Sequence, residues 1–158
     1  MDLLHGNVVA TLTEEYEIEY GAALSPKGEG WCVFIENIAV DFGFTDFIVQ
    51  VDKRHHPESC EFNSILEHED EHIAAHLSVI KDGQRNIKNA IAAAANNVLP
   101  MFVQSDDEID NAMNELETEL QNRPEIRLLR QKLTAEQEIR NKRIDMNDKG
   151  ERFRACSE

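Results

Sequence analysis

The sequence predicts an α+β protein in which a small antiparallel sheet comes first and helices follow. Two observations carry this prediction. Residues 7–53 contain runs that alternate apolar and polar side chains at the period of β-strands. From residue 57 onward, apolar residues recur every three or four positions, which is the period of an amphipathic helix. Strands that precede helices, instead of alternating with them, are typical of α+β proteins.

The sheet is expected to contain three to four strands joined by short turns. Four runs fit the strand period: residues 8–12, 16–20, 31–40 and 47–51. Between the second and third runs, residues 25–30 read Ser-Pro-Lys-Gly-Glu-Gly, a composition typical of a turn. Connections this short favour antiparallel neighbours.

A long first helix is expected over residues 57–99. Pro57 suits the first turn of a helix, and Pro100 ends the pattern. Gly83 lies inside this span, at a position where the helix is expected to kink or to divide into two.

Two further helices are expected within residues 105–149, separated by Pro124. A capping box formed by Ser105 and Glu108 marks where the first of them begins. A chain of 158 residues is long enough to bury a sizeable core. The sheet and the helices are therefore expected to form one domain over residues 1–158.

The composition argues against two classes of partner. Asp and Glu number 31 against 16 Lys and Arg, which gives a formal net charge of −15. A chain this acidic repels nucleic acid and anionic membrane surfaces at long range. No apolar run approaches the roughly 18 residues of a membrane span. We therefore expect no nucleic-acid partner and no transmembrane segment.

Residues 68–72 read His-Glu-Asp-Glu-His, an H-E-x-x-H motif on the first expected helix. At about 100° per residue, His68, Glu69 and His72 share the helix face of the neighbouring apolar residues, whereas the two intervening acids point to solvent. Burying these three polar groups together is costly unless they are satisfied, and one Zn²⁺ would satisfy all of them. The motif therefore predicts one zinc ion bound by His68 and His72, with Glu69 as the general base. Histidines at the edge of the core with internal hydrogen bonds are the alternative.

A catalytic zinc site needs a third protein ligand and an open position for water. Glu136 is the candidate, because it lies beside the apolar stripe of the third expected helix. The alternative for Glu136 is an ion pair with Arg140, four residues later on the same face. Asp110 and Glu117 on the second expected helix are the reserves.

His76 shares the helix face of the motif. It nevertheless lies about 12 Å along the axis from His68, too far for both to bind one ion from a straight helix. It is therefore expected beside the metal ligands, as a residue that orients them or donates to the oxyanion of the reaction.

The three cysteines are Cys32, Cys60 and Cys156, with no C-x-x-C pair among them. Either Cys60 pairs with Cys156 and leaves Cys32 free, or Cys32 pairs with Cys60. One disulfide would fit a periplasmic or secreted protein, and three buried thiols would fit a cytoplasmic one. The N-terminus has no signal peptide pattern, so the chain is expected to be either a mature secreted domain or a cytoplasmic protein.

The residues around the motif resemble a group of uncharacterised bacterial H-E-x-x-H proteins, which look like small secreted or periplasmic zinc metallopeptidases of the gluzincin type. The resemblance is carried by residues 53–62 and 65–72 and by three pairs near the end: Ala135-Glu136, Arg140-Asn141 and Ile144-Asp145. It implies a zincin-like fold and a zinc ion bound by His68, His72 and Glu136, with Glu69 as the general base. The chain departs from the gluzincin pattern at position 140, where Arg stands in place of the Asp that usually follows the glutamate ligand.

The motif and the resemblance together predict metal-assisted hydrolysis of a peptide or protein substrate. Residues 47–51, the last expected strand before the motif helix, occupy the place where such peptidases present an edge strand to an extended peptide. The alternative is a non-catalytic module of the same fold that binds zinc or a protein partner without turnover.

Overall fold

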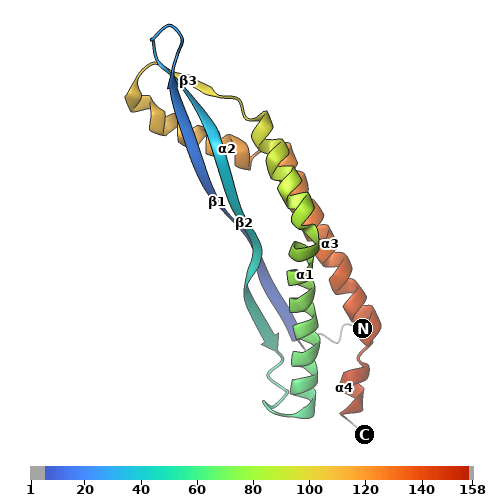
Figure 1. Ribbon diagram of the computed structural model, residues 1–158. Coiled ribbons are helices and arrows are strands. Elements are labelled where there is room, and N and C mark those ends of the chain that lie inside the picture. Colours follow the sequence, from blue (N-terminus) through green and yellow to red (C-terminus); the bar gives the residue numbers. More distant parts are fainter. Residues whose placement is uncertain (1–5, 157–158) are drawn as a thin grey trace. The chain divides into compact units, whose positions relative to one another are not determined.

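The computed structural model describes residues 6–156, which form a three-stranded sheet and helices (Figure 1). The strands are β1 (Gly6–Leu24), β2 (Trp31–Val51) and β3 (Met101–Val103). The helices are α1 (Cys60–Asn97), the 3₁₀ helix η1 (Asp106–Glu108), α2 (Ile109–Gln121), α3 (Pro124–Asp148) and α4 (Glu151–Ala155). The α+β class and the antiparallel sheet are confirmed.

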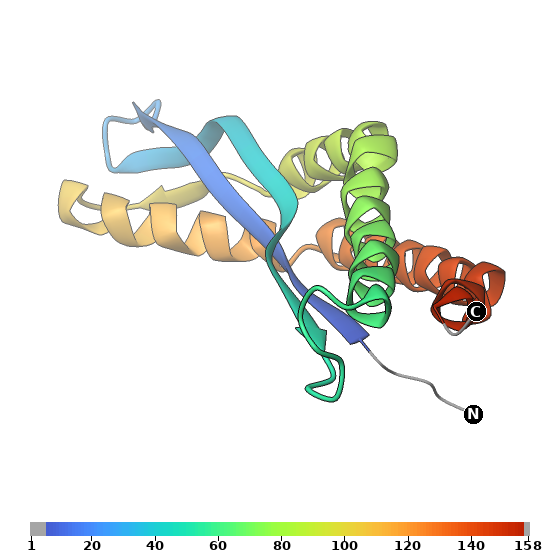
Figure 2. The ribbon, with the colours of Figure 1, turned by 90° about the horizontal axis from the view of Figure 1, so that it is seen from below.

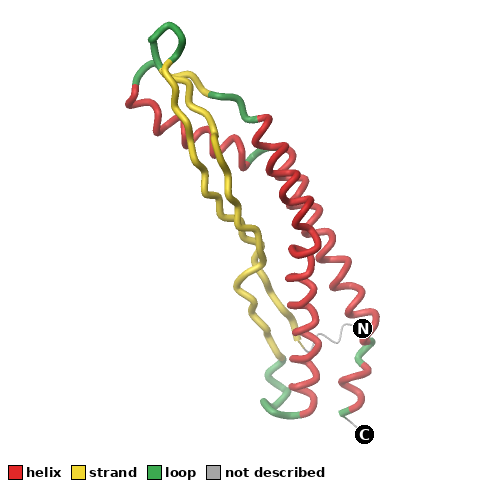
Figure 3. The backbone as a smooth tube through the Cα atoms, in the orientation of Figure 1, coloured by secondary structure: helices red, strands yellow, loops and turns green. Residues whose placement is uncertain are grey.

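The sheet has three strands, within the expected three to four, but its first two strands are longer than the predicted runs. The first two predicted runs belong to the single strand β1 and the last two to β2, as Figure 3 shows. In the sheet order β1-β2-β3, β2 pairs antiparallel with β3 through Trp31 opposite Val103 and Val33 opposite Met101. The strand β3 was not predicted, because three residues are too few to display a period of two.

The helix α1 carries the motif and passes through Gly83 without dividing, so of the two alternatives at Gly83 the division is wrong and the kink stays a prediction. One glycine costs a helix only about 1 kcal/mol, which the good helix formers on both sides of Gly83 offset. The helix begins at Cys60, later than expected, where the Phe62 backbone N–H donates to Ser59 Oγ at 3.1 Å. Ser59 thus caps the first turn.

The C-terminal helices follow their sequence signals. The capping box of Ser105 and Glu108 is present, and α3 begins at Pro124. After α3, Lys149 and Gly150 adopt left-handed backbone angles, with φ of 47° and 72°, and the chain then forms α4. The helix α4 was not predicted, since five residues do not reveal a helical period.

The described residues pack as two compact units. The first unit comprises residues 6–13, 42–83 and 133–156, and the second unit comprises residues 14–41 and 84–132. The elements β1, β2, α1 and α3 each contribute to both units. The expectation that the whole chain makes one domain stays a prediction.

The second unit is built around apolar side chains. Val33, Ala112 and Leu116 form one cluster, in which the sheet packs against α2. Figure 2 shows α2 along one face of the β1–β2 ribbon. Ala94, Leu120 and Ile126 form a second cluster, with 0% exposure for each side chain.

The first unit has a mixed interior. Its buried apolar residues include Phe44, Ile65, Val79 and Leu133. Buried with them are three polar residues of α1: Glu69, His72 and His76. Across the described residues, none of the helices combines the length and apolarity required to cross a membrane.

Candidate metal centre

Three ligand atoms from α1 and α3 meet in the first unit. His68 Nε2 lies 3.1 Å from His72 Nε2. Asp145 Oδ1 lies 3.2 Å from His68 Nε2 and 3.1 Å from His72 Nε2. The three atoms form a nearly equilateral triangle, and this group could hold a metal ion.

The size of the triangle fits a metal ion. In a tetrahedral zinc site with bonds of about 2.0–2.1 Å, neighbouring ligand atoms are about 3.3–3.4 Å apart. The observed edges of 3.1 and 3.2 Å are close to that separation. An ion about 1 Å above the plane of the triangle would lie about 2.05 Å from all three atoms. The side chain of Asp145 is 60% exposed, so the site is accessible from solvent.

In each imidazole, the partner of Nδ1 determines whether Nε2, the nitrogen in the triangle, carries a proton or a lone pair. His72 Nδ1–H donates to Asn141 Oδ1 at 3.1 Å, so a neutral His72 has a bare lone pair on Nε2. Asp148 Oδ2 lies 2.8 Å from His68 Nδ1, and its negative charge favours the proton on that nitrogen. The lone pair of His68 Nε2 then also faces the triangle.

When both imidazoles are neutral and carry their proton on Nδ1, two lone pairs and a carboxylate oxygen converge on one point. Three acceptors at about 3 Å without a proton between them repel one another, and a cation at their centre removes that repulsion. The buried Nδ1 atom of His68 lies near the Asp148 carboxylate but has no aligned hydrogen-bond partner among the described residues.

Sequence reasoning missed Asp145, although the polar spacing of α3 contains a signal for it. Asn141, Asp145 and Asp148 follow the i, i+4, i+7 spacing of one helix face, which complements the i, i+4 spacing of the two histidines. The face of α3 was instead extrapolated from Leu129, and Asp145 lies about 160° around the helix from that residue. The extrapolation fails because Leu129 packs in the second unit, whereas Asp145 lies in the first.

The structure does not bring Glu136 to the two imidazoles. Glu136 lies nine residues before Asp145, which is about 13 Å along α3. Its Oε1 atom accepts from Arg140 Nε at 2.9 Å, so the ion pair considered as the alternative is the arrangement present. Arg140 also donates to Ser78 Oγ at 2.6 Å and to Asp82 Oδ2 at 2.9 Å. The two reserve acids of α2 lie in the second unit.

Glu69 is buried against β1, with an exposure of 4%. Its carboxylate accepts the backbone N–H of Val8, and a Cβ atom added at Gly6 would lie 2.6 Å from Glu69 Oε1. Burial raises the pKa of the Glu69 carboxyl above its usual range, while the nearby His72 and His68 oppose that rise. A raised pKa suits a carboxylate that accepts and then returns a proton.

His76 lies in an aromatic setting between α1 and β2. Its ring makes edge contacts with Phe44 and Phe47, with centroids 4.9 and 5.9 Å away. Its Nδ1–H donates to the backbone carbonyl of His72 at 2.7 Å. His76 is therefore connected to the backbone of a ligand residue, and its contacts attach β2 to the motif helix.

The exposure of the two intervening acids of the motif matches the prediction. Asp70 and Glu71 are exposed, as the helical phase predicts.

The disulfide joins Cys60 to Cys156 and leaves Cys32 free, which is the first of the two pairings considered.

Comparisons with known proteins found no match to this chain among protein-family models, curated proteins or solved structures. An α+β class assigns no activity by itself, because one architecture supports many chemistries.

Proposed function

We propose that the protein is a zinc-dependent metallopeptidase, a hydrolase that cleaves peptide bonds. The observation that supports it is the convergence of His68 Nε2 and His72 Nε2 of α1 with Asp145 Oδ1 of α3 on one point. The helix α1 also carries Glu69, the glutamate of the H-E-x-x-H motif. In this proposal Asp145 takes the role predicted for Glu136. The zincin-like fold and the likeness to gluzincin-type peptidases are part of the same proposal.

Each residue around the ion has a distinct role. When bound, zinc supplies a Lewis acid that polarises the scissile carbonyl and acidifies the attacking water. Glu69 accepts the proton of that water at its carboxylate and returns it to the leaving amine. Asn141 accepts the Nδ1–H of His72, and the charge of the Asp148 carboxylate, 2.8 Å from His68 Nδ1, favours a proton on that nitrogen, so both residues favour the tautomer that presents Nε2.

The choice of zinc over other metals is supported by the motif glutamate. Two imidazoles and one carboxylate are also the donor set of non-haem Fe(II) oxygenases, and a triangle of this size accepts either ion. Those oxygenases have no need of a carboxylate base, whereas hydrolysis does. Glu69, buried and adjacent to a ligand, therefore favours hydrolysis on zinc.

The free edge of β2 supports a peptide as substrate. The strand β3 pairs with β2 only at residues 31–33, so over residues 42–51 the described structure places no third strand beside β2. Phe44 and Phe47 of this stretch contact His76 on α1, which brings the stretch beside the motif helix. An extended peptide can add to such an edge through main-chain hydrogen bonds.

The Cys60–Cys156 disulfide supports a periplasmic or secreted location, because disulfides persist in oxidising compartments.

A second candidate function is a zinc-binding module without turnover. The observation that favours it is the burial of the Glu69 carboxylate and its bond to the Val8 backbone, which leave that carboxylate engaged before any water arrives.

One experiment distinguishes the two functions. Protein purified without a histidine tag is analysed for zinc and iron and is incubated with a broad peptide library. We expect one zinc per chain, cleavage of the library, and a Glu69→Gln variant that keeps its zinc but turns over about 100- to 10,000-fold more slowly. Asp70→Asn, at the exposed neighbouring position, is the matched control and is expected to cleave normally.

The other outcomes are equally informative. Stoichiometric zinc with no cleavage would establish the binding module, and stoichiometric iron would replace the hydrolase with an oxygenase. Protein that contains no metal and does not respond to added zinc or chelator would contradict both candidate functions.

A further inference from the structure

The part of α3 that carries Asp145 is held without a buried apolar anchor. Leu133 is the last residue of α3 among the buried apolar residues of the described chain. Beyond it, Ile139 and Met146 are 52% and 68% exposed. Ile144 is partly buried, and the contacts with α1 that fix the segment are polar ones from Arg140, Asn141, Asp145 and Asp148. Its position therefore depends strongly on the groups that tether it at each end.

Arg140 tethers the segment on the N-terminal side of Asp145. Its guanidinium on α3 donates to Ser78 and Asp82 on α1, and it also pairs with Glu136 on its own helix. The side chain of Asp82 is 61% exposed, so one of these contacts lies in solvent.

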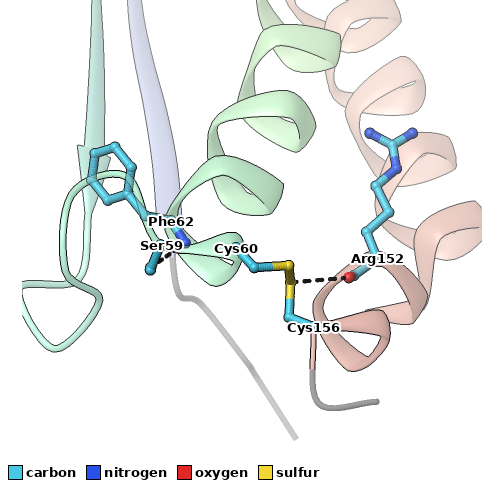
Figure 4. The surroundings of a disulfide bond; sticks show 5 residues. All are labelled: Ser59, Cys60, Phe62, Arg152 and Cys156. Atoms are coloured by element: carbon cyan, nitrogen blue, oxygen red, sulfur yellow. Dashed lines mark hydrogen bonds between the residues drawn. A yellow bond between two sulfur atoms is a disulfide. The ribbon is translucent and has the colours of Figure 1, made fainter.

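A disulfide tethers the segment on the C-terminal side, as Figure 4 shows. Cys156, at the end of α4, is joined to Cys60 in the first turn of α1. Cys60 lies eight residues before His68, and Cys156 lies eleven residues after Asp145. The bond therefore closes a loop of the chain that contains all three residues of the metal centre.

Apart from the disulfide, α4 contacts the rest of the chain from exposed or partly buried positions. The helix has five residues, none of them buried, and a helix of that length is not stable by itself. Arg152 pairs with Glu71 of α1, but these side chains are 39% and 45% exposed, and exposed ion pairs contribute little. The ring of Phe153 meets the ring of His55 at 5.3 Å between centroids. Of the described contacts of α4, the disulfide is the one that thermal motion cannot break.

We propose that the Cys60–Cys156 disulfide is a redox switch for the metal centre. While the bond is intact, it keeps Asp145 and Asp148 beside the two histidines and so maintains a high metal affinity. When the bond is reduced, α4 and the end of α3 separate from α1 more readily, the third ligand leaves, and the affinity falls. This inference rests on the proposed metal centre, because it concerns the same three ligands.

The physical basis is effective concentration. A ligand on a docked segment is presented to the ion at a high local concentration, which falls when the segment moves freely.

The reducing agent is a dithiol. Its thiolate attacks one sulfur of the disulfide, the Sγ–Sγ bond breaks, and a mixed disulfide forms. The second thiol of the reductant then displaces the protein sulfur. Two electrons and two protons pass to the protein, which leaves Cys60 and Cys156 as thiols and the reductant as a disulfide. Cys60 is exposed and Cys156 is partly exposed, so a reductant can reach the bond.

Zinc affinity, measured by competition with a chromophoric chelator, tests the switch. We expect the double variant Cys60→Ser, Cys156→Ser to bind zinc at least about tenfold more weakly than the wild type. Serine replaces cysteine because newly freed thiols would themselves bind zinc. Cys32→Ser, which removes the free cysteine and keeps the disulfide, is the matched control and is expected to bind as the wild type does.

A second measurement needs no variant of the disulfide and covers the case in which the double variant does not fold. Coupling between two equilibria is reciprocal, so zinc must stabilise the disulfide by the same factor by which the disulfide strengthens zinc binding. In a thiol–disulfide buffer, we expect zinc to shift the midpoint of reduction of the wild-type protein by about 30 mV for a tenfold coupling, with Asp145→Ala showing no shift.

Equal zinc affinity with and without the bond, or a midpoint that zinc does not move, would overturn the switch and leave the metal centre intact. Failure of the oxidised wild-type protein to bind zinc would instead overturn the proposed function.

Discussion

The two units of this chain bury different kinds of side chain. Four of the five largest fully buried side chains among the described residues belong to the second unit: Val33, Leu116, Leu120 and Ile126. The buried polar residues Glu69, His72 and His76 all belong to the first unit. The second unit therefore derives its stability from apolar burial, whereas the first unit devotes part of its interior to groups that are costly to bury.

This difference shows how one chain separates stability from chemistry. Apolar side chains stabilise the second unit through the hydrophobic effect, which requires no specific partner. The first unit joins its polar groups through specific contacts: three ligand atoms that could hold a cation, Arg140 on one side and a disulfide on the other. Substitutions in the two units should therefore change different properties.

The largest expected effect is on the second unit. Leu120→Ala removes a side chain with 0% exposure and should lower the free energy of unfolding by about 2–5 kcal/mol, through lost burial and the cavity left behind. Urea unfolding measures the change, and zinc affinity should stay constant. Leu128→Ala, at a position that is 50% exposed, is the control and should change the free energy of unfolding by less than about 0.5 kcal/mol. A marked loss of zinc affinity in Leu120→Ala would show that zinc binding in the first unit depends on the apolar core of the second.

The next effect concerns the third ligand. Asp145→Ala should weaken zinc binding about 100-fold or more, because one of three donors is lost. In zinc-free protein the same change should lower the free energy of unfolding by less than about 1 kcal/mol, because the Asp145 side chain is 60% exposed and exposed pairs contribute little.

Glu136→Ala, on the same helix, is the matched control for Asp145→Ala and should bind zinc normally, because Glu136 pairs with Arg140. Isothermal titration calorimetry of both variants with zinc shows whether Asp145 or Glu136 is the third ligand. The reverse pattern would restore Glu136 as the ligand.

A smaller effect is expected from the residues that orient the imidazoles. Asn141→Ala and Asp148→Ala should each weaken zinc binding about 10- to 100-fold, because each removes the group beside Nδ1 of a ligand imidazole. Asn147→Ala, at an exposed neighbouring position, should have no effect on the same titration. Normal affinity in both of the first two variants would show that the tautomers do not depend on these partners.

The smallest effect is expected at Gly6, and it concerns turnover only. An added Cβ atom would lie 2.6 Å from Glu69 Oε1 and 2.4 Å from Ile65 Cγ2, so Gly6→Ala should displace the proposed base. We expect kcat to fall about tenfold with zinc affinity unchanged, since misplacing a catalytic group slows the chemical step. Gly43→Ala, whose Cβ would meet nothing within 4 Å, is the control in the same peptide assay. Equal rates in the two variants would show that the position of Glu69 is not important for turnover.

The sequence by itself determined the local features of this protein. The α+β class, the capping box at Ser105, the end of α3 at Asp148 and the exposure of Asp70 and Glu71 all follow from patterns within a few residues of one another. Such patterns are readable because helix and strand periods arise from the backbone itself.

Only the tertiary structure decided the features that join distant segments. It merged the short predicted strands into β1 and β2, added β3, selected Cys156 as the partner of Cys60, and placed Asp145 beside His68 across a separation of 77 residues. Helical phase did not identify Asp145, although α1 lies beside α3 at both ends, where Ile126 packs against Ala94 and Asp145 contacts His68. Phase measured in the second unit does not say which residues meet in the first. Which segments meet is set by the packing of the whole chain, and no local period records it.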